Sequence, residues 1–269
     1  MKKQDRLWLA FLTGLAGFIW YRDQTWLGEG ADGLLILAAF GVFVWLGAPW
    51  CWRTDGFSLH RPALGVAAVA FVAGLQTNLT LLLAVGWTAA LWSWLRERLE
   101  AENVERARRL LVLPLLGFPW LTQDFPTLAW WFRLSAAWTA EQSFHGLGFA
   151  VQREGTQLFV QQMPFDVGPA CSGIKGLQAI WVMGTVLCAL QLGRSRAYWP
   201  SLVALPLVAW VANTLRVLAL MVVALTLGPE YASGWYHSAG GWLVLFTTFA
   251  LLWVALEWWR RVPVRMASA

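Results

Sequence analysis

Apolar residues occur in long runs along this chain, separated by short polar stretches. A helix needs roughly 17–25 mostly apolar residues to cross a bilayer, and eight segments approach that length. They are residues 7–21, 33–50, 62–77, 79–95, 110–125, 171–192, 199–227 and 237–258. Because a segment in lipid must satisfy its backbone hydrogen bonds internally, each is expected to be helical. The pattern predicts an all-α fold, a polytopic transmembrane helical bundle of about eight spans.

The segment between the fifth and sixth spans, residues 122–170, has a different pattern. Its first half, 126–148, carries apolar side chains at helical spacing: Trp130, Trp131, Leu134 and Trp138. This predicts an amphipathic helix lying in the outer membrane interface, with another short span as the alternative. Apolar and polar residues then alternate through 149–160 on either side of Glu154 and Gly155, which predicts a short strand pair.

Basic residues cluster between the apolar segments. The clusters are Lys2, Lys3 and Arg6; Arg53 and Arg61; Arg96, Arg98, Arg106, Arg108 and Arg109; Arg194 and Arg196; and Arg260, Arg261 and Arg265. If eight spans alternate in direction, every cluster falls on one side of the membrane, which the positive-inside rule identifies as the cytoplasm. We therefore expect a multi-pass protein of the plasma (inner) membrane with both termini cytoplasmic and residues 122–170 extracytoplasmic.

Composition supports the membrane class. The chain is 58% hydrophobic and 13% charged, whereas a soluble domain has about 25% charged residues. The net charge of +5 comes from clusters that follow the membrane topology, so we expect no nucleic-acid partner. Three cysteines are too few and too scattered for a disulfide framework. The three histidines lie far apart without metal-binding spacing, so we expect neither a metal nor a cofactor.

Cys171 stands at the start of the sixth span. Pro169 suits the first turn of a helix, so Cys171 falls near a helix N-terminus, where free N–H groups and the helix dipole favour an anion. Lys175 is four residues on and shares that face. Both effects are expected to lower the thiol pKa and to populate the nucleophilic thiolate. The alternative, a small apolar membrane residue, is our interpretation of Cys51 and Cys188.

Arg216 lies inside the apolar segment 199–227. An arginine there costs on the order of 3 kcal/mol or more, so it indicates a functional site. The alternative is a side chain that snorkels from near a helix end. Asn213 is three residues earlier on the same helical face, where it can orient the guanidinium.

His237 opens the last span and is expected at the outer surface, level with Cys171. Histidine suits proton transfer near neutral pH. The alternative is an interfacial histidine in an aromatic belt. His145 is on the correct side to be a spare candidate, whereas His60 falls in a cytoplasmic loop. A nucleophile, a base and an oxyanion stabiliser are the parts that acyl transfer needs.

The sequence resembles the exosortase/archaeosortase family in three blocks that follow the family's order. The blocks are Ala170-Cys171-Ser172-Gly173-Ile174, then Asn213-Thr214-Leu215-Arg216-Val217, then His237 at the start of the last helix. The strand-pair region also resembles the family, and the match covers roughly residues 110–255. The resemblance implies that Cys171, Arg216 and His237 are catalytic. Supporting or substrate-binding roles are expected for Lys175, Asn213, Ser172 and Gly173.

The resemblance also implies an activity: a membrane cysteine protease and transpeptidase, a hydrolase of peptide bonds. Its substrates would be exported proteins with a C-terminal sorting signal of the PEP-CTERM kind, consisting of a Pro-Glu-Pro-like motif, a transmembrane helix and a basic tail. Cleavage would occur at the extracytoplasmic face. The resemblance leaves open whether the product is then transferred to a surface or lipid-linked acceptor. It also implies an association with exopolysaccharide. Many members carry Arg at the position of Lys175. Lysine keeps the positive charge of that arginine but lacks its planar, forked guanidinium.

The chain shows no internal repeat and no Gly/Ser linker, so we expect one integral membrane domain over residues 1–269. Within it, 1–109 would form N-terminal spans, 110–258 the catalytic part and 259–269 a cytoplasmic tail. Two other classes stay open. One is a non-enzymatic transporter or a polysaccharide-export assembly factor, although no acidic residue lies mid-span as a coupling partner. The other is a membrane acyltransferase.

Overall fold

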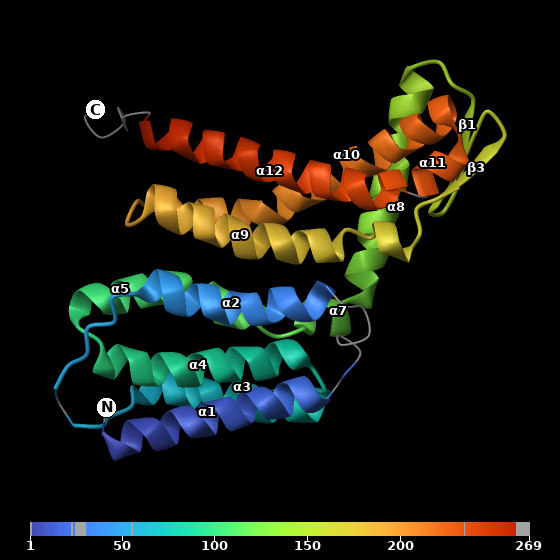
Figure 1. Ribbon diagram of the computed structural model, residues 1–269. Helices are drawn as coiled ribbons and strands as arrows, with labels where there is room; N and C mark the ends of the chain where they lie inside the picture. Colours follow the sequence, from blue (N-terminus) through green and yellow to red (C-terminus); the bar gives the residue numbers. More distant parts are fainter. Residues whose placement is uncertain (1, 23, 25–30, 55, 234, 262–269) are drawn as a thin grey trace, which may run out of the picture. The chain divides into compact units, whose positions relative to one another are not determined.

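A computed structural model describes residues 2–22, 24, 31–54, 56–233 and 235–261 (Figure 1). The side chains of residues 31, 32, 170, 229, 233 and 235–238 lie outside the described part, and so does most of the predicted tail, 262–269. The chain forms two compact units, Met1–Phe125 and Pro126–Ala269. The prediction of one integral membrane domain is not decided by this division, since two compact units can share one membrane, and it stays a prediction.

The first four predicted spans are helices of the first unit. They are α1 (Lys3–Arg22), α2 (Ala31–Gly47), α3 (Arg61–Thr77) and α4 (Thr80–Arg98). Helices α3 and α4 form an antiparallel hairpin that turns at Asn78, which adopts a left-handed conformation with φ 60°. Helix α1 packs on α4, and the buried Arg98 donates a 3.0 Å hydrogen bond to the buried carboxylate of Asp5.

The fifth predicted span, 110–125, is not one helix, and the prediction of a continuous span there is wrong. Helix α5 (Ala101–Leu110) ends where the predicted span begins, and the span itself contains two short helices, α6 (Val112–Leu116) and α7 (Trp120–Gln123). Gly117 ends α6, and Pro119 lacks the N–H that a continuing helix requires. This broken segment packs along α4 and ends where Asp124 accepts hydrogen bonds from the first backbone N–H groups of that helix.

The second unit begins with α8 (Pro126–Gly146), so the predicted helix is confirmed, while its place at a membrane interface stays a prediction. The sheet that follows has strands β1 (Val151–Glu154), β2 (Gln157–Val160) and β3 (Met163–Asp166), antiparallel in that order. The predicted strand pair is confirmed, and β3 adds a third strand. Gln161 and Gln162 form the second turn with φ of 49° and 68°, values for which glycine or asparagine is usual.

Three long helices complete the second unit: α9 (Ile174–Leu192), α10 (Tyr198–Leu227) and α12 (Trp235–Arg261). A short helix, α11 (Pro229–Ser233), joins the last two. The long helices pack against one another, and Figure 1 shows the starts of α9 and α12 at the same end as the sheet. The sixth, seventh and eighth predicted spans are therefore helices.

Three described helices are long and apolar enough to cross a bilayer: Ile174–Leu192, Tyr198–Leu227 and Ala239–Arg261. Shorter apolar helices cover Gly33–Gly47 and Arg61–Thr77. The described residues are thus mostly helical, with three candidate membrane spans and a small sheet. The number of about eight spans stays a prediction.

Helix α10 extends well past the start of α9. Its final turns pack on α8 and the sheet, where a buried apolar core forms. This core consists of Ala136, Ala137, Ala140, Phe144, Leu158, Val160, Val167, Val217 and Met221. One helix therefore links the apolar bundle to the module formed by α8 and the sheet.

Candidate active site

A tight turn carries Cys171 into the bundle. After β3, Pro169 begins a 3-10 turn, η2 (Pro169–Cys171), and the Cys171 N–H donates to the carbonyl of Gly168 at 2.9 Å. Gly173 then adopts a left-handed conformation with φ 76°, and α9 starts at Ile174. Cys171 thus lies one short turn before α9 rather than within it.

Asn213 of α10 holds the backbone of this turn. Its side-chain amide donates a 3.0 Å hydrogen bond to the main-chain carbonyl of Cys171. The same side chain packs on Gly173, because a Cβ added to that glycine would lie 2.5 Å from Asn213 Cγ. Asn213 is 7% exposed, so a buried polar group finds its partner here. The turn and α10 therefore fit together only with a glycine at position 173.

Arg216 is the next residue on this face of α10, one turn beyond Asn213, and it is half-buried. Its guanidinium lies over Gly241 of α12, where an added Cβ would be 3.4 Å from both Cζ and Nε. The guanidinium thus lies at contact distance from α12, at a position that carries no side chain. Because Asn213 is level with the start of α9, Arg216 lies near the end of the bundle rather than in its middle.

Burial raises the pKa of the Cys171 thiol above its ordinary value. The charge of Arg216 lowers this pKa, Asp166 raises it, and Arg133 lowers it. The sequence predicted a lowered pKa, and that prediction is wrong in sign. Cys171 packs against the apolar core of the module formed by α8 and the sheet, and the cost of desolvating a thiolate there exceeds the lowering by Arg216 and Arg133.

Arg133 of α8 is a residue that the sequence analysis did not select. Its Nε donates to the carbonyl of Val167, and its terminal nitrogen donates to Thr156 Oγ1 at 3.2 Å. It also lies 3.9 Å from an Asp166 carboxylate oxygen. The signal available in the sequence was a lone cation among the tryptophans of the predicted helix.

The other predicted residues have different surroundings. Ser172 is half-buried and donates its N–H to the carbonyl of Pro169 at 3.1 Å. Lys175 is exposed in the first turn of α9. His237 belongs to the first turns of α12, but its side chain lies outside the described residues. Position 237 is four residues before Gly241, so the two positions share a helical face.

The remaining histidines and cysteines lie elsewhere. His145 is exposed in the last turn of α8, and Cys188 is buried within α9. His60 caps α3 of the first unit, where its ring nitrogen accepts from the Ala63 N–H, and Cys51 belongs to the same unit. The described residues contain no group of three or more His, Cys, Asp or Glu side chains placed to hold a metal ion.

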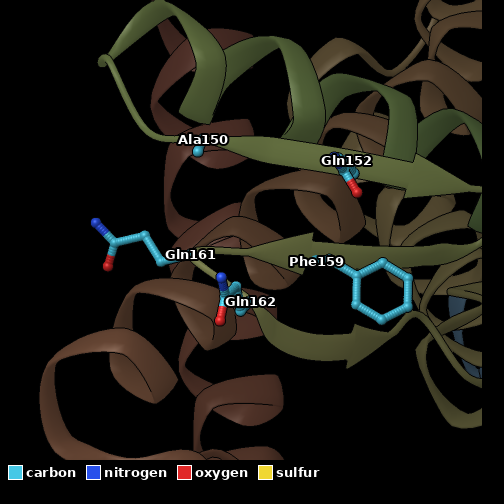
Figure 2. Close-up of a pocket in the computed structure, with 5 residues that line it drawn as sticks. All are labelled: Ala150, Gln152, Phe159, Gln161 and Gln162. Atoms are coloured by element: carbon cyan, nitrogen blue, oxygen red, sulfur yellow. The ribbon is translucent and has the colours of Figure 1, made fainter.

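Figure 2 shows an open hollow of about 520 Å³ on the sheet. It is lined by Ala150, Gln152, Phe159, Gln161 and Gln162. Gln152 and Phe159 alternate along their strands with residues that face inward, so the hollow lies on the outer face of the sheet. Its lining has no titratable group and offers neither nucleophile nor base.

Comparison with known families decides the identity of the chain. The family model described as transmembrane exosortase (Exosortase_EpsH) matches residues 8–254, which is most of the chain. The chain belongs to the exosortase family. The resemblance noted in the sequence is confirmed, and the match extends through the N-terminal helices. No curated protein and no solved structure matches. Exosortase membership and the apolar helices together establish a multi-pass membrane protein.

Proposed function

We propose that this exosortase is a membrane-embedded cysteine peptidase and transpeptidase that cleaves the C-terminal sorting signal of exported proteins. One observation carries the proposal. The Arg216 guanidinium is close enough to Cys171 to lower the thiol pKa, and Asn213, one turn earlier on α10, bonds to the Cys171 carbonyl. A nucleophile and a cation are thereby held at one end of the second unit. The proposed nucleophile and this cation are two of the three parts that acyl transfer requires, and the third is a base.

In the proposed reaction the Cys171 sulfur attacks the scissile carbonyl. Because burial raises the thiol pKa, a base must accept the thiol proton, and His237 is the proposed base. Arg216 stabilises the oxyanion of the tetrahedral intermediate. His237 then gives the proton to the leaving amine, which leaves an acyl group on sulfur as a thioester. Water or an acceptor nucleophile attacks the thioester and regenerates the thiol.

The orientation of the site is part of the proposal. Arg194 and Arg196 lie in the turn between α9 and α10, and Arg260 and Arg261 lie at the C-terminal end of α12. Cys171 is at the opposite ends of these helices. Since basic residues favour the cytoplasmic side, this separation supports an extracytoplasmic active site and cytoplasmic termini.

The proposed substrates follow from the family. They carry a short Pro-Glu-Pro-like motif, a transmembrane helix and a basic tail, and they reach the site through the lipid bilayer. Exposed Lys175 and half-buried Ser172 flank Cys171 and are proposed to contact the motif. The acceptor is either water or a surface or lipid-linked nucleophile, and an association with exopolysaccharide belongs to the same proposal.

Co-expression with an exported protein bearing such a signal tests the proposal. The native chain is expected to yield a shortened substrate by mass spectrometry, whereas Cys171→Ala and Cys171→Ser leave it intact while inserting normally. Cys188→Ala is the matched control, because Cys188 is buried within α9. Normal processing by Cys171→Ala would contradict the nucleophile assignment. No processing by the native chain across several signals would favour a transporter or an acyltransferase.

A further inference from the structure

Arg133 contacts three parts of the module formed by α8 and the sheet. It extends from α8 to the carbonyl of Val167, to the hydroxyl of Thr156 between β1 and β2, and to the carboxylate of Asp166 at the end of β3. Thr156 Oγ1 also lies 3.4 Å from Asp166 Oδ1. The Arg133 side chain is 19% exposed, so these contacts are formed largely out of water, where charge-assisted hydrogen bonds are stronger.

These contacts hold the end of β3, and the short segment that follows β3 leads directly to Cys171. Val167 is buried in the same apolar core against which Cys171 packs, and the two residues are separated only by Gly168, Pro169 and residue 170. Helix α8 also contacts the turn η2 directly. A movement of the Arg133 side chain would therefore move the short segment that presents the thiol.

We propose that Arg133 is a positioning residue for Cys171: its contacts hold the turn that presents the thiol, and its charge and that of Asp166 act on the thiol with opposite sign. The inference rests on the proposed role of Cys171 as nucleophile. The thiolate is the reacting species, so a fixed cation increases and a fixed anion decreases its population.

The charged groups around the thiol come from several elements. Arg133 lies on α8, Asp166 on β3 and Arg216 on α10, while Lys175 is exposed in the first turn of α9. His237 belongs to α12, and its side chain is outside the described residues. Arg216 is assigned to the reaction itself, which leaves the ion pair of Arg133 and Asp166 as the part that can be varied without touching a reacting group.

The test compares Arg133→Gln with Asp166→Asn in the full-length protein in detergent. The rate of alkylation of Cys171 by iodoacetamide is followed by peptide mass spectrometry across a pH series. Arg133→Gln is expected to slow alkylation and Asp166→Asn to speed it, each by about twofold or more near neutral pH. Both variants break the same ion pair, so a purely structural role would move both rates in the same direction. That outcome, or no change in either rate, would overturn the proposal.

Three controls sharpen the comparison. Arg153→Gln removes an arginine of the same module that is paired with Glu141 at 2.7 Å, and it is expected to change the rate less than Arg133→Gln. Arg133→Lys keeps the charge and loses the bond from Nε, so it separates positioning from charge. Cys51, half-buried in the first unit, is the internal reference for alkylation.

Folding and function are kept separate in this design. Asp166 has a side chain that is 53% exposed, so Asp166→Asn is expected to accumulate normally and must by itself speed alkylation if the proposal holds. Alkylation needs no substrate. If the native chain processes no sorting signal but the two rates still move in opposite directions, the proposed function fails and the charge pair stands.

Discussion

The Asn213 side-chain amide donates a 3.0 Å hydrogen bond to the main-chain carbonyl of Cys171. The two residues are 42 positions apart in the sequence, and the bond joins α10 to the turn before α9. Asn213 also precedes Arg216 by one helical turn. One short stretch of α10 therefore sets both the backbone of the proposed nucleophile and the cation beside it.

Loss of this hydrogen bond is expected to impair the site. Asn213→Ala leaves a carbonyl unsatisfied, at a cost of about 1–3 kcal/mol, and we expect processing to fall about tenfold or more. The measurement is the rate of substrate shortening in cells with matched protein levels. Thr214→Ala is the control, since the Thr214 hydroxyl bonds only to Trp210 within α10 among the described contacts. Equal effects from both variants would argue against a special role for Asn213.

Glycine is required at position 173. Gly173→Ala places a Cβ 2.5 Å from Asn213 Cγ on a backbone with φ 76°, so we expect displacement of the turn and loss of most processing. Gly176→Ala is the matched control on α9, where an added Cβ meets no atom within 4 Å. It is expected to be as active as the native chain. The comparison is made on protein recovered from membranes, and normal activity of Gly173→Ala would refute the packing described here.

Substitution of the adjacent glycines Gly240 and Gly241 of α12 is expected to affect substrate processing differently. An added Cβ at position 241 would already touch the Arg216 guanidinium at 3.4 Å, so the two further methyl groups of Gly241→Val are expected to displace it. Gly240→Val meets open space, since no atom lies within 4 Å of its Cβ position. We expect Gly241→Val to reduce processing at least tenfold and Gly240→Val to reduce it little. A larger loss from Gly240→Val would indicate a different orientation of α12.

The pH dependence of thiol reactivity has a defined sign. Burial raises the pKa of Cys171, so less thiolate is present at a given pH, and the midpoint of alkylation should lie above that of an ordinary thiol. Arg216 lowers this pKa, so Arg216→Gln is expected to move the midpoint to still higher pH. The rate of Cys171 alkylation against pH measures both effects. A midpoint below the ordinary value in the native chain would contradict the burial described here.

The first unit allows a stability prediction. Asp5 is fully buried and accepts hydrogen bonds from Trp94 Nε1 at 3.1 Å and from Arg98 at 3.0 Å. Asp5→Ala leaves the charge of Arg98 without this carboxylate, at an expected cost of about 3–5 kcal/mol. Glu105 is half-buried on α5 and pairs with Arg108 at 3.0 Å and with Arg109 at 2.9 Å; Glu105→Ala is the control and should cost about 1 kcal/mol or less. Thermal unfolding in detergent compares the two variants.

Much of the fold follows from the distribution of apolar residues. The three long helices of the second unit were predicted because their apolar runs are unbroken over many turns, and α8 because its apolar residues recur at helical spacing. The fifth span was not, since the apolar run hides Gly117 and Pro119, which interrupt the helix. Strand β3 was missed because its turn uses two glutamines in left-handed conformations, and no local rule favours them.

Some features of the candidate site could likewise be predicted from the sequence, and others could not. Arg216 and Asn213 could be selected from the sequence because each is polar within an apolar segment, and Cys171 because it stands near a predicted helix N-terminus. The sign of the Cys171 pKa shift could not, because it depends on a core that assembles from α8, the sheet and α10. Arg133 escaped selection for a related reason: its partners come from the β1–β2 turn and from the segment after β3, and their proximity arises only on folding.

Helix α10 is longer than its neighbour α9, and this difference bears on how far Cys171 lies from the membrane core. The residues of α9 span about 28 Å, close to the thickness of a bilayer core, while α10 continues for about 20 Å beyond Asn213. If α9 crosses the bilayer as proposed, the bond from Asn213 holds the backbone of Cys171 at the level where α9 begins, which is the proposed membrane boundary. A substrate anchored by its own helix would then be cut at a distance measured from the lipid. Spacers inserted between its motif and its helix should therefore matter as much as the motif itself.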